Sequence, residues 1–249
     1  MRRAMIEVDG KVLEATVDEN GQPSVNGQAV KPDAWKAPFS GTVFGIALNY
    51  QGLLDSKIAE FNQDPYKTPP KTPVLYIKTP NTVVGHEGNI VFPAGVDAIQ
   101  AGPALGVVIG KRASRVSEAE AMDYVGGYTA VNEVTLPEVS FYRPAVKAKC
   151  RDTFCPVGPV VVDAADIKDP HALEIRLLVN GEVRQQNSTA NFVRSIPELI
   201  SFLSQFMTFE PGDLIITGVP EGRVDIAVGD KVEVEIAGLG RLSNTVVAE

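Results

Sequence analysis

Short apolar runs, rich in β-branched residues and ended by Gly, Pro or Asp, recur along most of this chain. They lie at residues 42–48, 74–78, 105–109, 127–134, 157–162, 173–178, 214–217 and 232–236. Runs of this length and composition are typical of strands. Asn180-Gly181, between two further apolar stretches, is the dipeptide that favours a two-residue hairpin. This pattern predicts an α+β fold that is mostly β, with few short helices, rather than an alternating α/β fold.

The first forty residues differ from the rest. Residues 6–17 alternate in polarity around the turn signal Asp9-Gly10, and Asn20-Gly21 and Asn26-Gly27 are further turn signals. Residues 32–38 begin and end with proline and have the composition of a linker. A chain of 249 residues forms one large domain or two small ones. We therefore expect an N-terminal β-rich appendage and linker over 1–39, and a catalytic domain over 40–249.

Three segments predict helices. Residues 117–124 and 195–206 each open with the Ser-x-x-Glu pattern of a capping box, which satisfies amide groups at a helix start. In the second segment, one helical face is apolar and is expected to pack on the sheet. That face consists of Ile196, Leu199, Ile200, Leu203 and Phe206. Residues 51–61 give a weaker helical signal.

The charge balance excludes several classes of partner. Lys and Arg total 23 and Asp and Glu total 31, so the formal net charge is −8. A chain with this charge repels nucleic acid and anionic lipid. No apolar run approaches the roughly 20 residues that a membrane helix needs, and residues 1–7 lack the apolar region of a secretory signal. With two cysteines in all, we expect a cytoplasmic protein without nucleic-acid or membrane partners.

Several common catalytic motifs are missing from the sequence. It contains no P-loop, no complete dinucleotide-binding glycine motif and no Gly-x-Ser-x-Gly elbow. The two histidines, His86 and His171, follow Gly and Pro and are expected in surface loops. Cys150 and Cys155 lack the second pair of ligands that a zinc site needs, so we expect them to be small buried residues.

One basic stretch stands out in this acidic chain. Residues 143–151 hold four cations and no acidic residue: Arg143, Lys147, Lys149 and Arg151. If 145–151 is extended, Lys147, Lys149 and Arg151 project from one face of the strand. Converging cations suit a substrate with two or three carboxylates. The alternative is a strand face that is simply solvated.

Ordered segments over most of the chain resemble those of the fumarylacetoacetate hydrolase superfamily. They are residues 45–50, 76–80, 107–111, 127–135, 148–159, 179–182, 210–213 and 216–222, and the match runs from about Thr42 to Val247. The resemblance implies a mixed β-sandwich roll with a cleft that handles 2-oxo acids or acylpyruvates.

Residues 64–72 and 136–152 resemble one branch of that superfamily more closely. This branch is the N-terminal half, or separate N-terminal subunit, of the bifunctional isomerase/decarboxylases of 4-hydroxyphenylacetate (homoprotocatechuate) catabolism. The resemblance implies decarboxylation of 5-oxopent-3-ene-1,2,5-tricarboxylate and isomerisation of 2-hydroxyhepta-2,4-diene-1,7-dioate. It also implies an oligomer.

The sequence departs from the superfamily at the metal site. The superfamily uses Mg²⁺ or Mn²⁺, held by a Glu-x-Glu whose positions here are Gly102 and Ala104, and by an Asp whose position is Glu133. One carboxylate does not hold Mg²⁺ against its hydration shell, so we expect no metal at the usual site. The lid His and Glu positions are Leu53 and Ser56, and Asp55 is a possible substitute base.

The resemblance places Lys149 at the position of the superfamily's active-site lysine, where an ammonium group can stabilise an enolate. Lys149 is therefore the expected catalytic residue. The expected substrate-binding residues are Lys78, Arg143, Lys147, Arg151 and Asn49.

Three functions remain open from the sequence. The chain can be an enzyme component that acts with a metal-binding homologue, or as a homo-oligomer, on a small polycarboxylate. It can instead be a non-catalytic structural subunit. It can also be a divergent acylpyruvate-type hydrolase that binds its metal through Glu133 with Glu87, Asp97 or Glu138.

Overall fold

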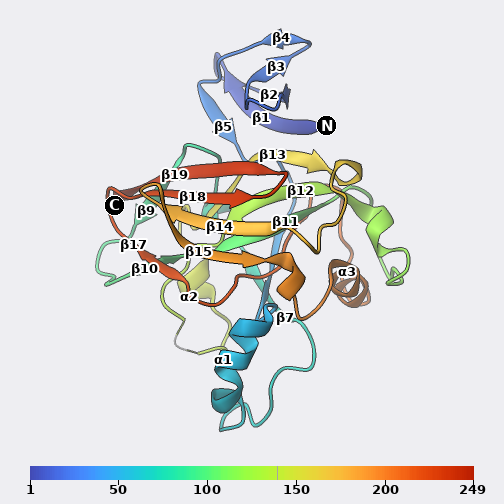
Figure 1. Cartoon of the computed structure of the whole chain (residues 1–249), viewed down its shortest axis with the longest axis vertical. Coiled ribbons are helices and arrows are strands. Elements are labelled where there is room, and N and C mark those ends of the chain that lie inside the picture. Colours follow the sequence, from blue (N-terminus) through green and yellow to red (C-terminus); the bar gives the residue numbers. More distant parts are fainter. Residues whose placement is uncertain (139) are drawn as a thin grey trace.

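Two β-sheets packed face to face form the centre of the molecule in the computed structural model, which describes residues 1–138 and 140–249 (Figure 1). The strands are β1 (Arg2–Val8), β2 (Lys11–Val17), β3 (Pro23–Val25), β4 (Gln28–Ala29), β5 (Ala34–Lys36), β6 (Val43–Ala47), β7 (Val74–Lys78), β8 (Val83–Val84), β9 (Asn89–Phe92), β10 (Ile99–Ala101), β11 (Pro103–Ile109), β12 (Val125–Asn132), β13 (Cys155–Asp163), β14 (Glu174–Val179), β15 (Glu182–Ser188), β16 (Leu214–Ile216), β17 (Val224–Ile226), β18 (Lys231–Ile236) and β19 (Gly240–Ala248). The α-helices are α1 (Gln51–Phe61), α2 (Val146–Lys149) and α3 (Ile196–Ser204), with 3₁₀ turns η1 (Pro80–Thr82), η2 (Ala121–Tyr124), η3 (Ala164–Asp166) and η4 (Thr189–Asn191).

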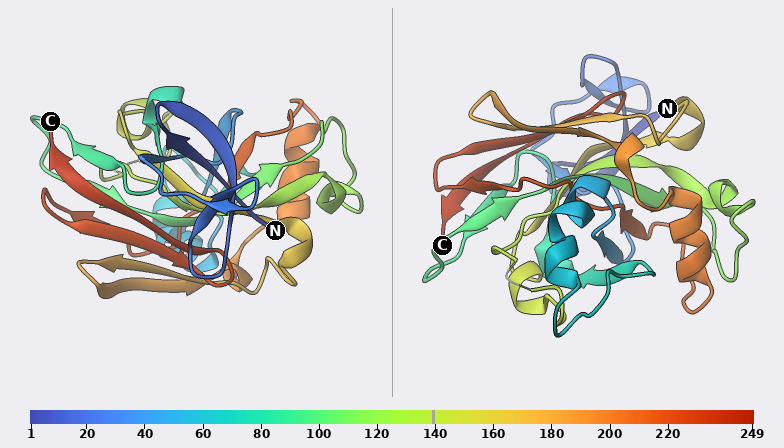
Figure 2. Two further views of the ribbon diagram at one scale, coloured as in Figure 1. Left: turned by 90° about the horizontal axis from the view of Figure 1, so that it is seen from above. Right: turned by 60° about the horizontal axis from the view of Figure 1, so that its bottom comes forward.

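The large sheet has the order β4-β3-β2-β1-β13-β12-β11-β16-β6-β7, with β5 added beside β1 and β8 beside β13. The second sheet has the order β15-β14-β18-β19-β9, and β10 pairs with β17 in a separate ribbon. Seen from above, the two sheets lie as layers (Figure 2). This architecture confirms the predicted mostly-β fold with few short helices.

Apolar side chains from both sheets meet between the layers. Leu105 and Val107 of β11 belong to the same buried cluster as Leu177 of β14 and Val234 of β18. Burial of apolar area at roughly 25 cal/mol per Å² is the main force that holds such layers together. The site described below lies outside this cluster, near the ends of β7 and β12 (Figure 1).

The turn signals of the sequence mark real hairpins. Asp9 and Gly10 both have positive φ between β1 and β2, and Asn26 and Gly27 do so between β3 and β4. Asn180-Gly181 likewise joins β14 and β15, as predicted. Positive φ at both central positions is the geometry that favours Asn-Gly and Asp-Gly.

Two of the three expected helices are present. Residues 51–61 form α1, and α3 begins with the predicted capping box, in which Glu198 N donates to Ser195 Oγ and Ser195 N donates to the Glu198 carboxylate. Ile196, Leu199, Ile200 and Leu203 are buried as expected. Phe206 is the exception, because it follows the end of α3 and is exposed.

The prediction of a helix over 117–124 is wrong. The structure has only the 3₁₀ turn η2, and the Ser117 hydroxyl donates to the Glu120 carboxylate instead of accepting from an amide. The extended conformation considered for 145–151 is not formed, because four of these residues form helix α2. Residues 146–149 form a single helical turn, and in this turn Lys149 contacts Glu133 and Glu138.

The N-terminal strands continue the large sheet, since β1 pairs with β13 as well as with β2. Residues 32–38, expected to be a linker, include β5, which pairs with β1. Helix α1 lies at the end of the molecule opposite β1–β4 (Figure 1). No helix in the described residues has both the length and the apolar character needed to span a membrane.

Candidate active site

Glu133 lies at the centre of a buried group of charges. It follows β12, where its amide donates to the carbonyl of Gly102 at 2.7 Å, and its side chain has no solvent exposure. Three cations from distant parts of the chain surround its carboxylate. They are Lys78 at the end of β7, Lys149 at the end of α2 and Arg223 just before β17.

Lys78 contacts both the Glu133 carboxylate and three backbone carbonyls. Its Nζ donates to the carbonyls of Val134, Lys149 and Phe154 at 2.7, 2.9 and 2.8 Å, which uses all three of its hydrogens. The same Nζ lies 2.8 Å from Glu133 Oε1. Burial lowers the pKa of Lys78, and the adjacent Glu133 opposes that effect.

Lys149 and Arg223 share the other oxygen of Glu133. Lys149 Nζ donates to Glu133 Oε2 at 3.0 Å, and Arg223 Nη2 donates to the same oxygen. Arg223 Nη1 also donates to the backbone carbonyl of Glu133 at 2.8 Å. Burial by itself raises the pKa of Glu133, but the three cations outweigh burial, so that pKa lies well below its ordinary value. Glu133 is therefore an anion at neutral pH.

Glu138 is a second carboxylate in contact with the same cations. Its Oε1 lies 2.8 Å from Lys149 Nζ, and its Oε2 lies 3.6 Å from Arg223 Nε. The side chain of Glu138 is 16% exposed, whereas that of Lys149 is 3% exposed. Glu138 thus covers the cationic pair on the side that faces solvent.

The aromatic ring of Tyr76 packs against the ammonium group of Lys149. Lys149 Nζ lies 4.9 Å from the centre of the Tyr76 ring, a distance at which the ring face attracts a cation. Tyr76 pairs with Gly45 across β6 and β7, and a Cβ on Gly45 would lie 2.0 Å from the Tyr76 ring. Burial, together with Glu133, raises the pKa of Tyr76, so its phenol stays protonated. Glycine at position 45 therefore makes room for the aromatic support of Lys149.

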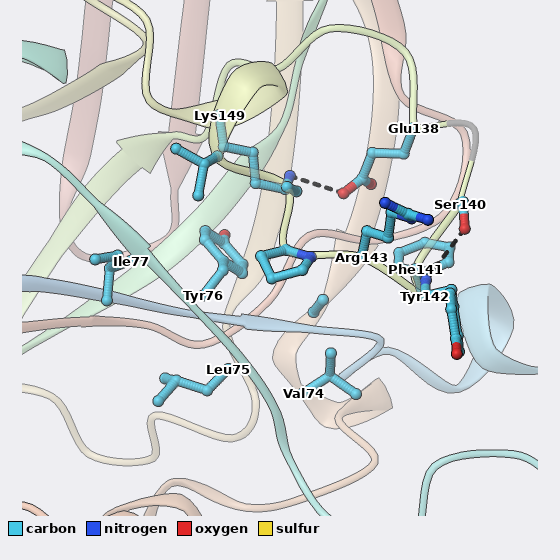
Figure 3. A pocket seen from close by; sticks show the side chains of 14 residues that line it. Val74, Leu75, Tyr76, Ile77, Glu138, Ser140, Phe141, Tyr142, Arg143 and Lys149 are labelled. Atoms are coloured by element: carbon cyan, nitrogen blue, oxygen red, sulfur yellow. Dashed lines mark hydrogen bonds and ion pairs between the residues drawn. The ribbon is translucent and has the colours of Figure 1, made fainter. Parts of the chain in front are cut away.

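A cavity of about 460 Å³ opens beside Lys149. It is lined by β7, by the described part of the segment 138–145 and by the start of α2, and its walls are mostly apolar. Figure 3 shows Lys149 paired with Glu138, and it shows Arg143 and the aromatic rings of Phe141 and Tyr142 on the same side as Glu138, whose segment they continue. A volume of this order accommodates a small organic acid.

The structure separates the residues expected to bind substrate. Lys149 and Arg143 line the cavity, but Lys147 and Arg151 do not. Arg151 Nε donates to the carbonyl of Lys147 at the far side of α2. Asn49 is buried, and its side chain bonds to the backbone of Arg194 and Thr217. Asn49 therefore joins the chain segments around α1 rather than facing the cavity.

The remaining candidates lie apart from the charged group. Cys155 is buried as expected, and burial raises the pKa of its thiol to about 12, but Cys150 is only half-buried. The histidines are not plain surface residues, because His86 Nδ1 accepts from Ser243 N and His171 Nε2 accepts from Ile196 N, at the start of α3. Leu53, which stands at a lid position, lines a small recess that also touches Arg223.

Sequence reasoning missed Arg223 and Tyr76 as site residues and named Glu138 only as a possible metal ligand. Tyr76 stands inside a segment that carried the family resemblance, and Arg223 directly follows another. Charge and aromaticity within or beside such segments were the available signals. Val139, within the 136–152 motif, lies outside the described residues.

Comparisons with known proteins agree with this geometry. The model of the family "Fumarylacetoacetate (FAA) hydrolase C-terminal" matches residues 42–247. The 4-hydroxyphenylacetate degradation bifunctional isomerase/decarboxylase of Salmonella dublin is 45% identical over 217 residues, which cover 86% of this chain and 49% of that protein. This chain therefore spans about half the length of that relative.

Solved structures extend the similarity to the whole fold. The 5-carboxymethyl-2-hydroxymuconate delta-isomerase of Mycobacterium smegmatis superposes with a TM-score of 0.84 at 30% identity, covering 100% of this chain and 99% of that one. The fumarylpyruvate hydrolase of Pseudomonas aeruginosa, solved in complex with Mn²⁺ and pyruvate, superposes with a TM-score of 0.74 at 27% identity, covering 91% and 95%. Proteins similar to this chain thus include one that binds Mn²⁺.

The residues of this chain do not fit such a metal. Gly102 and Ala104 have no ligand atoms in their side chains, and Glu133 is already in contact with three cations that would repel a metal ion. A Cβ on Gly102 would lie 2.4 Å from Arg223 Nη1 and 2.7 Å from the carbonyl oxygen of Glu133. The guanidinium group thus fills the space beside Gly102. Among the described residues, no three His, Cys, Asp or Glu side chains lie close enough to share a metal ion.

Proposed function

Because this chain belongs to the fumarylacetoacetate hydrolase family, we propose that it is a component of a bifunctional isomerase/decarboxylase. Its substrates in this proposal are 5-oxopent-3-ene-1,2,5-tricarboxylate and 2-hydroxyhepta-2,4-diene-1,7-dioate, from 4-hydroxyphenylacetate catabolism. The observation that carries the proposal is a nearly buried lysine, Lys149, in the wall of a cavity of about 460 Å³.

The charges at this cavity suit a substrate with several carboxylates. Lys149 and Arg143 both line it, and the rest of its walls are mostly apolar. When the carboxylate at C2 of 5-oxopent-3-ene-1,2,5-tricarboxylate leaves as CO₂, the electrons of the broken C–C bond pass through the C3–C4 double bond to the ketone oxygen at C5, which forms a dienolate. An ammonium group held in a mostly dry site stabilises that negative charge. We assign this role to Lys149, substrate binding to Arg143, and a positioning role to Lys78 and Asn49.

The half-length match supports a partner. We propose that the chain assembles with a metal-binding homologous subunit that supplies the missing half, or with copies of itself. We place this assembly in the cytoplasm, since Cys150 and Cys155 are both free thiols.

A structural subunit is the second candidate, and one observation favours it. Lys149, which lines the cavity, and Arg223 behind it are already paired with carboxylates of the chain itself. A divergent metal-dependent hydrolase is the third candidate. It would need a ligand set built on Glu133 with Glu87, Asp97 or Glu138, against the repulsion of the three cations.

A decarboxylation assay on the purified chain separates these candidates. The chain is stripped with chelator and given 5-oxopent-3-ene-1,2,5-tricarboxylate, then assayed again with added Mg²⁺ and with the metal-binding homologue. We expect CO₂ release by the chain without metal, or release by the mixture at a rate above that of the homologue alone. Turnover that requires Mg²⁺ in the chain alone supports the divergent hydrolase, and no turnover in any mixture supports the structural subunit.

A further inference from the structure

A carboxylate already lies between Lys149, which lines the cavity, and Arg223, which lines a small recess beside it. Glu138 Oε1 is 2.8 Å from Lys149 Nζ, and Glu138 Oε2 is 3.6 Å from Arg223 Nε. Glu138 belongs to the cavity wall, and its side chain is the more exposed partner of the Lys149 pair. The structure therefore displays how these two cations hold a carboxylate.

We propose that Lys149 and Arg223 form a metal-independent carboxylate subsite, which Glu138 fills until a carboxylate of the substrate displaces it. The proposal deepens the proposed function, on which it rests for the class of its ligand, a small polycarboxylate. It assigns Arg223 as a substrate-binding residue and Glu138 as a resident competitor.

The charge of the group supports this exchange. With Glu138 in place, three cations face two carboxylates, Glu133 and Glu138. When Glu138 leaves, the same three cations face Glu133 alone, which leaves a formal excess of two positive charges. A polycarboxylate restores the balance, and in a site mostly closed to water its interaction with the cations is stronger than in bulk solvent.

The two carboxylates differ in how firmly they are held. Glu133 has no exposure, its backbone oxygen accepts from Arg223 and three cations contact its carboxylate. Glu138 contacts Lys149 and one distant nitrogen of Arg223, and it reaches solvent. Glu138 is therefore the carboxylate that a ligand can replace, while Glu133 keeps Lys149 and Arg223 in position.

Arg223 occupies the space beside Gly102. Its Nη1 would lie 2.4 Å from a Cβ on Gly102, so a longer side chain at position 102 would require the guanidinium group to move. Arg223 carries a permanent positive charge with several directed N–H groups, which suits carboxylate binding. The subsite consequently needs no divalent cation.

Calorimetric titration with propane-1,2,3-tricarboxylate tests the proposal, because this probe needs no turnover. The titration is done on the full chain in chelator and again with Mg²⁺. Glu138→Gln removes the competing charge while keeping the size of the side chain, so we expect the probe to bind at least about tenfold more tightly. That change corresponds to the loss of one charge-assisted hydrogen bond within the chain. Arg223→Gln should weaken binding by a similar factor, and Arg223→Lys by less.

Glu182→Gln, at an exposed position on β15, is the control for a changed net charge and should leave the affinity unchanged. If Glu138 only stabilises the fold, Glu138→Gln lowers the melting temperature and leaves the affinity unchanged or weaker, which overturns the proposal. Binding that requires Mg²⁺ in the wild-type chain also overturns it, and that result needs no variant.

The binding and turnover experiments distinguish a wrong subsite from a wrong enzyme function. Tight, metal-independent binding by Glu138→Gln without any decarboxylation supports the subsite and rejects the enzyme function. If the wild-type chain decarboxylates the substrate but Glu138→Gln binds the probe with the wild-type affinity, the function is supported and the subsite is rejected.

Discussion

Glu133 is the residue on which the charged group depends. A fully buried carboxylate is stable as an anion only when nearby cations compensate for its lost hydration. Here Lys78 and Glu133 have no side-chain exposure, so neither charge is screened by water. Removal of one member of such a pair leaves the other buried without compensation.

We therefore expect Glu133→Gln to lower the free energy of unfolding by about 3–5 kcal/mol, the usual loss when a buried ion pair is broken from one side. Urea unfolding at neutral pH measures this loss. Glu233→Gln is the matched control, because Glu233 is also nearly buried but its partners Lys231 and Arg241 are exposed. An equal loss in the two variants would show that burial of the carboxylate alone, and not the buried cations, sets the effect.

Glu133→Gln also tests how the stability of the chain depends on pH. The pKa of Glu133 is lower in the folded chain than in the unfolded chain, where a Glu has a value of about 4.3. Its stabilising contribution is therefore present above that value and is lost as the pH falls toward the folded pKa. We expect acid to destabilise the wild-type chain more steeply than Glu133→Gln, and parallel acid profiles would contradict this account.

At the scale of elements, the two Ser-x-x-Glu segments differ in spite of the same pattern. Ser195 accepts from Glu198 N and starts the nine-residue helix α3, whereas Ser117 donates to Glu120 before a 3₁₀ turn. The apolar face of α3 is buried, and that burial stabilises the helix that the cap begins.

We expect Ser195→Ala to lower the free energy of unfolding by about 1 kcal/mol, as the loss of a helix cap does. Ser117→Ala should change it by less than about 0.5 kcal/mol, because no helix amide loses a partner. Thermal unfolding of both variants measures the two losses of stability. Equal losses would mean that the difference between the two segments has no energetic consequence.

Local patterns predicted the hairpins, most strands, α1 and α3, because adjacent residues alone determine those features. They failed for 145–151, since residues two apart share a strand face but not a helical face. Helix α2 exists because Lys149 reaches Glu133 and Glu138, and those contacts are not encoded within the segment itself.

For the whole molecule, the first strand is part of the large sheet. Ala4 and Ile6 of β1 belong to the same buried cluster as Tyr128 of β12, and β1 pairs with β13. We keep the division at residue 40 as a proposal, since every residue that lines the main cavity follows it.

Deletion of residues 1–39 tests this division. The deletion exposes one edge of β13 and the apolar surface that Ala4 and Ile6 cover, and exposed edges promote association between chains. We expect residues 40–249 to melt at a lower temperature than the full chain and to self-associate in sedimentation experiments. A shortened chain with the same assembly state and melting temperature as the full chain would show that 1–39 is an independent appendage.

The buried group of charges around Glu133 forms only in the complete fold. Family resemblance indicated Lys149 and Lys78, but the meeting of Glu133, Glu138, Lys149 and Arg223 depends on how strands far apart in sequence are placed. No spacing in the sequence encodes that meeting. Sequence reasoning therefore named Lys149 as a candidate, while the cation beside Gly102 emerged only from the fold.

The central claim is that Lys149, at the cavity, acts on a polycarboxylate. Lys147 and Lys149 lie on the same short helix, but only Lys149 lines the cavity. The most direct measurement is the rate of CO₂ release from 5-oxopent-3-ene-1,2,5-tricarboxylate by the wild-type chain, Lys149→Gln and Lys147→Gln, each with the homologous subunit present. The account predicts a rate at least about a hundredfold lower for Lys149→Gln, as for the loss of an electrostatic group at a developing anion, and an unchanged rate for Lys147→Gln. Equal rates for Lys149→Gln and the wild type would contradict it.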